Sequence, residues 1–566
     1  MHLDILTQPP DTFVVESLLT PTPDTIGLVK TYDEVSASKL RGGFYTPDAL
    51  VDLCLDRALE LADGRSELTV LEPSAGDGAF IRGLARHHAG RLVAHVYASE
   101  LVPEEASKSR SALEQASLEG TVRSGSYLQH RALRDYDVAI GNPPFLRFQF
   151  VADADVAASR NLAVGDTPIG RVSNLWIPVF LKALSELTDG GAFSFVVPAE
   201  FLTGVSAKVV RTYLVQRTDR LRIDLFGARS FPNVLQEVVI LSGRVSSQLA
   251  GECKVEVYDH IIRESWTHLV DATPPTWTHL LLRPSHVDAI SHIQTLSKLK
   301  RFGDVAKLGV ATVTGANDFF SVTDDIVIQY HLQNWTLPLL ARARQAKGLR
   351  LTDEDIEENR LRGLPARILD FSEARQTPEG SAHASAYIEI GEERELHKRY
   401  KCRIRSPWYR VPIVKPGTVL LSKRSHLYPR LIANDALAVT TDTIYQGSPL
   451  PAYVGREHDI VASFHNTFTL LSAEIAGRSF GGGVLELVPS EVASLLLPLA
   501  PVDESTFSRL DTLVRELHGQ DSEELVEITD ELVTSDIPEL AGELLDSARS
   551  ARELLLRRRL DRAAST

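Results

Sequence analysis

The amino-acid sequence predicts an α/β protein: a Rossmann-like, doubly wound and mostly parallel sheet, followed by a mixed α+β domain and a helical C-terminal tail. Two observations predict this order. From residue 44 to about 243, apolar runs of strand length alternate with segments of helical periodicity. After about 250 the strand-like runs become shorter and turns more frequent, and from 503 the pattern is helical.

The first predicted element is a helix in "FYTPDALVDLCLDRALELA" (44–62), with Thr46 as N-cap and Pro47 at the first helical position. Six strands are expected after it. Most of them are continuous apolar runs, which indicates strands covered by helices on both faces. The expected strands are 68–73, 92–100, 137–142, 192–198, 221–226 and 237–243.

The chain length of 566 residues exceeds what one hydrophobic core accommodates, so several domains are expected. The changes in pattern place their boundaries. We expect an N-terminal arm at 1–38, a first domain at 39–250, a second domain at 285–500 and the helical tail at 503–566.

The sequence predicts a cytoplasmic protein without a membrane segment or a metal. No signal peptide is recognisable, and no stretch approaches the roughly 20 apolar residues of a membrane helix. Cys54, Cys253 and Cys402 lie far apart, which is typical of a reducing compartment and excludes a Cys-based zinc site. There is no H-E-x-x-H motif and no His/Asp cluster, so no metal is expected.

Charge is segregated along the chain. The net charge is -15, yet the stretch from Lys398 to Arg430 contains no Asp or Glu, whereas 503–546 is dominated by them. Lys and Arg with interleaved aromatic rings are typical of a nucleic-acid surface, the alternative being a solvated basic face. The predicted DNA-binding residues are Lys398, Arg399, Lys401, Arg403, Arg405, Trp408, Arg410, Lys423 and Arg424.

A candidate cofactor site lies in "TVLEPSAGDGAF" (69–80), where a strand, an acidic residue and a glycine-rich turn precede a helical segment. Ligands of open α/β sheets bind beyond the carboxyl ends of the strands, and Gly76 and Gly78 permit close approach. Glu100 ends the next strand, where a carboxylate can hold ribose hydroxyls. The G-x-G-x-x-G and Walker spacings are absent.

The acidic residue Glu72, placed ahead of those glycines, suits a cationic ligand better than a pyrophosphate. S-adenosylmethionine carries a sulfonium and an ammonium and therefore fits. The alternative is a glycine turn that only connects a strand to a helix.

A candidate catalytic turn, "GNPPF" (141–145), follows the third apolar strand. An exocyclic amine conjugated to a base ring is a poor nucleophile and needs hydrogen-bond acceptors. The Asn142 side-chain carbonyl and the Pro143 backbone carbonyl could supply two. Pro143 and Pro144 stiffen the turn, and Phe145 would stack on a base flipped out of a duplex. The alternative is a strand-ending turn with a core Phe.

Together these segments resemble the DNA N6-adenine methyltransferases whose cofactor motifs precede the catalytic motif and a C-terminal target-recognition domain, the gamma-type order. The resemblance implies a class I methyltransferase fold, S-adenosylmethionine as cofactor, and methyl transfer to adenine N6 at specific sites in double-stranded DNA. "GGFYTPDALVDLC" (42–54) is similar to the family's first cofactor motif, and "GNPPF" to its catalytic motif. The cofactor residues that the resemblance implies are Tyr45, Thr46, Pro47, Glu72, Pro73, Ala75, Gly76, Gly78, Glu100, Ser126 and Asn142.

Further positions extend the resemblance, with two departures. "FGARSFPNVLQEVVIL" (226–241) is similar to the segment whose aromatic residue packs on the far face of the flipped adenine, which implies Phe231 in that role. Ser126 stands where the family usually has an Asp that contacts the cofactor's adenine amine, and Phe145 stands where Tyr is commoner.

Downstream, 307–320, 405–416, 442–447 and 477–498 resemble recognition domains of restriction–modification methylases. No nuclease constellation is present, so cleavage would come from a separate restriction endonuclease or other defence-system subunits. The alternatives are an RNA or protein-glutamine methyltransferase, a cytosine-N4 enzyme, which usually has Ser in place of Asn142, and a catalytically inactive DNA-binding specificity subunit.

Overall fold

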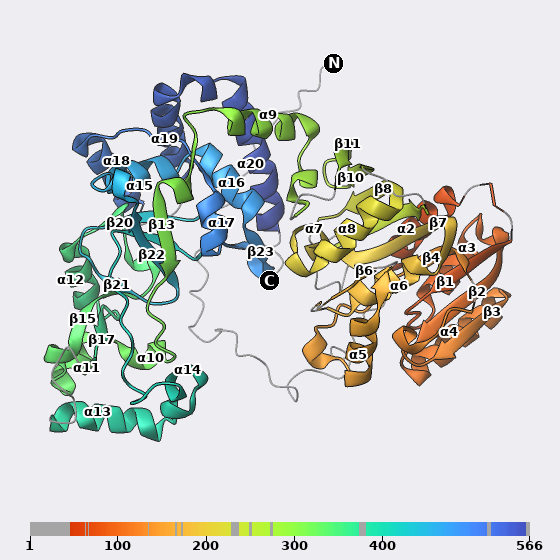
Figure 1. Cartoon of the computed structure of the whole chain (residues 1–566), viewed down its shortest axis with the longest axis horizontal. Helices are drawn as coiled ribbons and strands as arrows, with labels where there is room; N and C mark the ends of the chain where they lie inside the picture. Colours follow the sequence, from red (N-terminus) through yellow and green to blue (C-terminus); the bar gives the residue numbers. More distant parts are fainter. Residues whose placement is uncertain are drawn as a thin grey trace, which may run out of the picture.

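The computed structural model describes residues 46–561 apart from 63, 66, 134, 165–166, 171, 173, 228–236, 248–251, 272–275, 373–380 and 518–521. Two lobes are visible in Figure 1, one built on a large sheet and one containing smaller sheets and most of the later helices. No helix in these ranges is both long enough and apolar enough to cross a membrane.

The N-terminal lobe is built on a nine-stranded sheet of order β11-β10-β8-β9-β7-β4-β1-β2-β3. Five of its neighbouring pairs are parallel, and β9 runs antiparallel to both β7 and β8. The predicted mostly parallel sheet is confirmed. The strands are β1 (Leu68–Glu72), β2 (Val93–Glu100), β3 (Gly120–Ser124), β4 (Tyr136–Gly141), β7 (Leu187–Pro198), β8 (Thr218–Leu225), β9 (Val238–Val245), β10 (Cys253–Asp259) and β11 (Glu264–Val270).

Helices cover both faces of this sheet. Alternate residues of a strand point to opposite faces, so Val70 and Val138 pack with α2 and α3 while their neighbours Leu71 and Ala139 pack with α6. The helices of this lobe are α2 (Asp48–Leu61), α3 (Ala79–Arg86), α4 (Pro103–Ala116), α5 (Asp153–Asn161), α6 (Trp176–Ser185), α7 (Glu200–Thr203) and α8 (Lys208–Arg217).

One predicted helix start is wrong. Pro47, not Thr46, is the N-cap of α2, and no side chain caps this helix. The Thr46 hydroxyl instead accepts a hydrogen bond from the Asn142 amide, so Thr46 lies against the candidate catalytic turn.

The C-terminal lobe is mixed α+β, as expected. It contains a five-stranded sheet (β13-β22-β18-β20-β16), a four-stranded sheet (β14-β17-β15-β21) and a three-stranded sheet (β19-β24-β23). Their strands are β13 (Ala306–Val310), β14 (Ser321–Val322), β15 (Thr336–Leu340), β16 (Arg350–Leu351), β17 (Arg367–Leu369), β18 (Val419–Ser422), β19 (Arg424–Ser425), β20 (Leu431–Asn434), β21 (Val439–Thr440), β22 (Ile444–Pro449), β23 (Arg478–Phe480) and β24 (Val484–Glu486). The helices are α9 (Pro284–Thr295), α10 (Asn317–Phe320), α11 (Asp324–Gln329), α12 (Asp353–Leu361), α13 (Ala382–Glu393), α14 (Tyr400–Arg403), α15 (Glu457–Phe464), α16 (Thr467–Ala476), α17 (Pro489–Ser494), α18 (Glu504–Glu516), α19 (Glu523–Asp536) and α20 (Glu543–Asp561).

Helix α20 joins the two lobes (Figure 1). Its residues Ala548, Ala551 and Leu555 belong to the same hydrophobic core as the N-terminal sheet. Two adjacent arginines near the end of α20 then pair with carboxylates of different lobes. Arg558 donates to Asp259 at the end of β10 (2.6 Å), and Arg559 donates to Glu474 of α16 (2.6 Å).

Both ion pairs are buried, with side-chain exposures of 5% for Arg558 and 2% for Asp259. Burying a charge is costly unless it is paired and hydrogen-bonded. Arg559 meets that condition because it also donates to the carbonyls of His426, Leu427 and Gly483. The end of the predicted tail is therefore packed between the lobes.

Arg558→Met should lower the free energy of unfolding by about 3 kcal/mol or more, because it leaves Asp259 buried without its partner. The neighbouring Arg557 is exposed, so Arg557→Met is the matched control and should stay within about 0.5 kcal/mol of the wild type. Urea unfolding followed by tryptophan fluorescence measures both. Equal midpoints for the two variants would show that the buried pair contributes nothing to stability.

Candidate active site

The candidate site lies where three parallel strands end side by side. β1 pairs with β2 on one side and with β4 on the other, both in parallel register. Their carboxyl ends carry Glu72, Glu100 and the turn that begins at Asn142. This edge is where open α/β sheets bind ligands.

The two glycines after β1 have different structural roles. Gly78 has φ +85°, and a Cβ built on it would lie 2.9 Å from Ala112 Cβ and 3.2 Å from Ser109 Cα of α4. Gly76 has φ +55°, and a Cβ there would meet no atom within 4 Å. Gly78 is therefore required by helix packing, whereas Gly76 borders open space on the site.

The Glu100 carboxylate is fixed by two backbone amides. Gly76 N–H donates to its Oε2 (2.9 Å) and Val102 N–H to its Oε1 (2.8 Å). These bonds tie the loop after β1 to the loop after β2. Each carboxylate oxygen can accept a second hydrogen bond, so the group can still receive ribose hydroxyls.

Glu72 is a buried carboxyl without a partner. It is 1% exposed, and neither of its oxygens has a hydrogen bond within the described ranges. Burial, reinforced by the nearby Glu100 and Asp77 carboxylates, raises the pKa of Glu72 well above its usual value. A cationic ligand group would supply the missing partner.

The Asn142 turn is fixed by hydrogen bonds to two other segments. Asn142 Nδ2 donates to Thr46 Oγ1 (3.1 Å), and the Ser74 hydroxyl donates to the Asn142 backbone carbonyl (3.2 Å). In the part of the chain that the structure describes, Asn142 Oδ1 and the Pro143 carbonyl have no hydrogen bond. Two acceptors therefore remain available on a fixed turn.

The other predicted residues of this site lie as follows. Pro73 and Ala75 are buried in the turn after β1, and Ala75 N–H donates to the Ser99 carbonyl (2.9 Å). Ser126 is half-buried and begins the short turn after β3. Pro144 and Phe145 are half-buried, and Phe145 packs against the cores on both faces of the sheet. Tyr45 and Phe231 lie outside the described residues.

Sequence reasoning missed Ser74 and Ser109. Ser74 supports the catalytic turn, and the Ser109 hydroxyl donates to the Gly76 carbonyl (2.8 Å). Ser74 could have been noticed, because it stands inside the quoted motif between Pro73 and Ala75. Nothing in the sequence indicates that Ser109 of α4 meets this turn.

The structure divides the predicted DNA-binding residues into two groups. Lys398, Arg399, Lys401 and Arg403 are exposed on or beside α14. Two others make internal contacts. Arg405 donates to the carbonyls of Val313 and Thr314, and Trp408 is 8% exposed with its indole N–H donating to Glu392. Their surroundings give Arg405 and Trp408 structural roles.

Three further predicted residues complete that set. Arg410 and Lys423 are half-buried, and Arg424 is exposed and paired with Glu486. Within the exposed group, Lys398 pairs with Glu395 and Arg399 with Asp318. DNA contact by the exposed residues stays a prediction.

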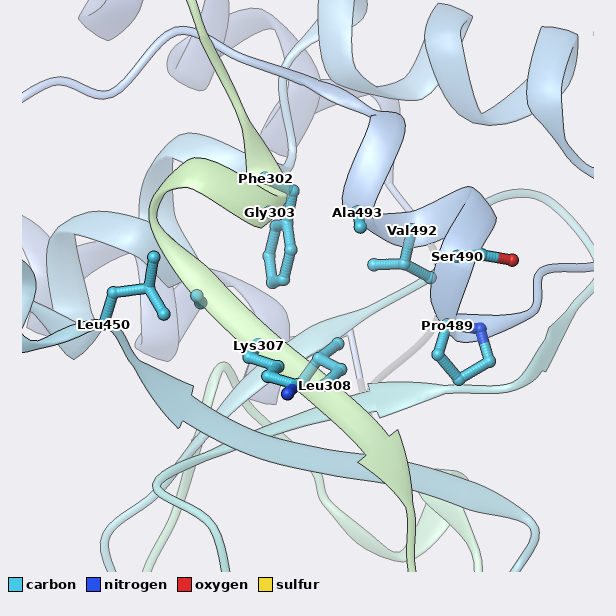
Figure 2. A pocket seen from close by; sticks show the side chains of 10 residues that line it. Phe302, Gly303, Lys307, Leu308, Leu450, Pro489, Ser490, Val492 and Ala493 are labelled. Carbon is cyan, nitrogen blue, oxygen red and sulfur yellow. The ribbon is translucent and has the colours of Figure 1, made fainter.

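A pocket of about 380 Å³ lies elsewhere, in the C-terminal lobe between β13 and α17 (Figure 2). Its lining is mostly apolar and contains no residue of the β1–β4 edge. The lining residues are Phe302, Gly303, Ala306, Lys307, Leu308, Leu450, Pro489, Ser490, Val492 and Ala493.

Two family models match the chain. The Eco57I restriction-modification methylase model matches residues 103–231, and the model of the C-terminal domain of the type II methyltransferase M.Eco57I matches residues 275–534. The chain thus carries Eco57I-type restriction-modification methylase domains. The first match covers the candidate catalytic turn at 141–145, and the second covers the C-terminal lobe up to α19.

Curated relatives agree with this assignment. The type II methyltransferase M.AccI of Acinetobacter calcoaceticus is 24% identical over 490 residues, which are 82% of this chain and 88% of that protein. The type II methyltransferase M.HincII of Haemophilus influenzae is 22% identical over 200 residues, 35% of this chain and 36% of that protein.

The fold has a solved counterpart. The type IIL restriction-modification enzyme MmeI, solved in complex with DNA, aligns with 90% of this chain and 75% of that chain, with a TM-score of 0.53 and 12% identity. At that identity the similarity shows the fold of the methylase alone.

S-adenosylmethionine is the cofactor expected for this class, and the residues present fit it. The buried Glu72 carboxyl lacks a counter-charge and suits a cation, while Glu100 has acceptor capacity for a ribose diol. Open space also lies beside Gly76, whose backbone N–H donates to the Glu100 carboxylate.

Alanine at the two glycines should separate ligand binding from folding. Gly78→Ala should lower the melting temperature strongly, because left-handed strain of about 1–2 kcal/mol adds to the overlap with α4. Gly76→Ala should cost only about 1 kcal/mol of stability but greatly weaken binding of S-adenosylmethionine, because its Cβ enters the open space. Thermal melts with and without the cofactor test this, and the reverse pattern would contradict these assignments.

Proposed function

We propose that this methylase is a site-specific DNA methyltransferase that transfers a methyl group from S-adenosylmethionine to N6 of an adenine flipped out of duplex DNA. The observation that carries the proposal is the Asn142 amide, held at the end of β4 by Thr46, with the unpaired Glu72 carboxyl at the end of the neighbouring strand β1. The match to restriction-modification methylases supports DNA as the substrate.

The Asn142 amide is oriented for the chemistry of an amine. Because Nδ2 donates to Thr46, the Oδ1 end remains available to accept a hydrogen bond from one N–H of the adenine amine. The Pro143 carbonyl can accept a hydrogen bond from the other N–H. Two acceptors localise the nitrogen lone pair, which is otherwise delocalised into the ring, and so make N6 nucleophilic.

When bound, S-adenosylmethionine supplies an electrophilic methyl group on a sulfonium. Glu72 would hold the cationic methionine portion and Glu100 the ribose. Pro143 and Pro144 restrict the backbone of the turn, so its acceptors need little reordering when the base arrives. Phe145 would stack on the flipped base.

Adenine is favoured over cytosine because position 142 is Asn, whereas the cytosine-N4 enzymes usually have Ser there. The protein is the modification enzyme of a restriction–modification or related phage-defence system in this proposal. A separate chain would then supply cleavage.

Asn142→Ala should reduce methyl transfer at least about 100-fold while leaving cofactor binding measurable, because it removes one preorganised acceptor from the transition state. The assay is tritiated methyl transfer to unmethylated genomic DNA, followed by identification of the labelled nucleoside by mass spectrometry. Asn161→Ala, an exposed asparagine at the end of α5, is the matched control and should be fully active. Label in cytosine, or equal activity of the two variants, would contradict the proposal.

Cofactor binding should release a proton from Glu72. Burial favours the protonated carboxyl in the free protein, and a bound cation favours the carboxylate, so affinity should rise with pH until the raised pKa is passed. Calorimetric titrations in two buffers of different ionisation enthalpy measure the released proton. Glu72→Gln should bind without proton release, and release that persists in this variant would place its source elsewhere.

A further inference from the structure

Two large apolar side chains are exposed at α14 in the C-terminal lobe: Tyr400, the first residue of this helix, and Ile404, its C-cap residue. Tyr400 is 64% exposed and Ile404 is 62% exposed, and they lie four residues apart, one helical turn. Cys402, between them in sequence, is fully buried. Isolated exposed apolar residues are common, but two on the same face of one short segment form a local apolar ridge.

This ridge is held in a fixed position. A Cβ built on Gly315 would lie 2.8 Å from Lys401 Cβ and 3.1 Å from Cys402 Sγ, so α14 rests directly on the backbone of the 313–317 loop. The Arg405 guanidinium binds the carbonyls of Val313 and Thr314 in the same loop. Because this backbone is already held in place, little conformational entropy of the segment would be lost when a partner binds the ridge.

Cations surround the ridge. Lys401 Nζ lies 5.7 Å and Arg403 Cζ 5.6 Å from the centre of the Tyr400 ring. Neither side chain pairs with a carboxylate in the ranges that the structure covers. Lys398 and Arg399 are exposed close by, each with a single acidic partner. An occupant of this surface must combine negative charge with stacked apolar surface, and duplex DNA does so.

We propose that Tyr400 and Ile404 form a wedge that enters duplex DNA and unstacks a base step, while Lys401 and Arg403 bind the flanking phosphates. This inference rests on the proposed DNA methyltransferase function and adds the residues that deform the substrate. Apolar wedges lose base stacking at the step they enter and gain in return a kinked duplex that contacts more protein surface. Unstacking beside the target would ease extrusion of its base.

The position of α14 agrees with this role. Figure 1 shows α14 at the end of the C-terminal lobe, on the side that faces α5 of the N-terminal lobe. A duplex held there would run along the side of the molecule where both lobes can contact it.

The test uses the full chain and a plasmid of unmethylated DNA, and measures affinity, its salt dependence and methyl transfer. Tyr400→Ala should weaken DNA binding about 5- to 150-fold, the range for loss of one stacked ring, with an unchanged slope of log affinity against log salt. Tyr400→Phe should restore binding. The double variant Lys401→Gln/Arg403→Gln should instead reduce the slope by about 2, because each phosphate contact contributes about 0.9.

Ile404→Ala should also weaken binding, and its matched control is Ile328→Ala, a 63% exposed isoleucine on α11. Melting temperatures equal to the wild type exclude a folding defect, and the Tyr400→Phe rescue tests the ring itself. Ligation of nicked plasmid in the presence of protein reports unwinding as a change in linking number, which Tyr400→Ala should abolish.

The outcomes separate this inference from the function on which it rests. DNA binding and unwinding that depend on Tyr400, without methyl transfer by the wild type, would support the wedge and count against the proposed function. Methyl transfer with equal affinity and unwinding in Tyr400→Ala and Ile328→Ala would overturn the wedge alone. Binding of the wild type to phosphatidylserine vesicles through Tyr400, with no Tyr400 dependence on DNA, would also overturn it.

Discussion

The parallel register of β1 with β2 and β4 is the constraint on which the candidate active site depends. It brings three chain segments that are far apart in sequence to one edge of the sheet. Hydrogen bonds then connect them: Gly76 to Glu100, Ser74 to Asn142, and Asn142 to Thr46. The acceptors on the turn and the carboxyls at the ends of β1 and β2 are positioned by the fold itself, so little reorganisation is needed when ligands bind.

The six expected strands correspond to β1, β2, β4, β7, β8 and β9. The signal was clearest for β1, β4 and β9, which are buried over nearly their whole length, because burial on both faces makes a strand continuously apolar. β3 was missed, since its "GTVRS" is a partly exposed edge strand with one large apolar residue. β10 and β11 alternate buried and exposed residues, a weaker signal than an apolar run.

At the site, motif spacing identified Glu72, Gly76, Gly78, Glu100 and Asn142, which the structure places at one edge. Residues that tertiary packing brings to the site, such as Ser109, belong to no motif and could not be predicted from the sequence. The basic stretch from Lys398 to Arg430 shows the same limit of sequence-based prediction. Its composition predicted one DNA-binding surface, yet the Trp408 side chain packs in a core while the Tyr400 side chain faces solvent. Which side of a one-turn helix is buried depends on its neighbours, here the backbone at Gly315, and not on its own residues.

The C-terminal arginines illustrate how burial changes the meaning of charge. In sequence, "LLLRRRLDR" is equally compatible with a solvated helix and with a DNA-binding one. In the structure, Arg558 and Arg559 each neutralise a buried carboxylate. Arg557, on the same helix, is exposed to solvent. Three consecutive identical residues thus differ because the helix turns them toward different neighbours.

This arrangement has a consequence for how such enzymes can acquire new specificities. A chimera that replaces the C-terminal lobe with that of a relative has no simple boundary after the C-terminal sheets. The reason is that α20, the last described helix, contributes to the core of the N-terminal lobe. A transplanted C-terminal lobe would bring its own α20, and the residue opposite Asp259 would then come from the other protein. A chimera built on this N-terminal lobe therefore needs a basic residue that can pair with the buried Asp259 carboxylate.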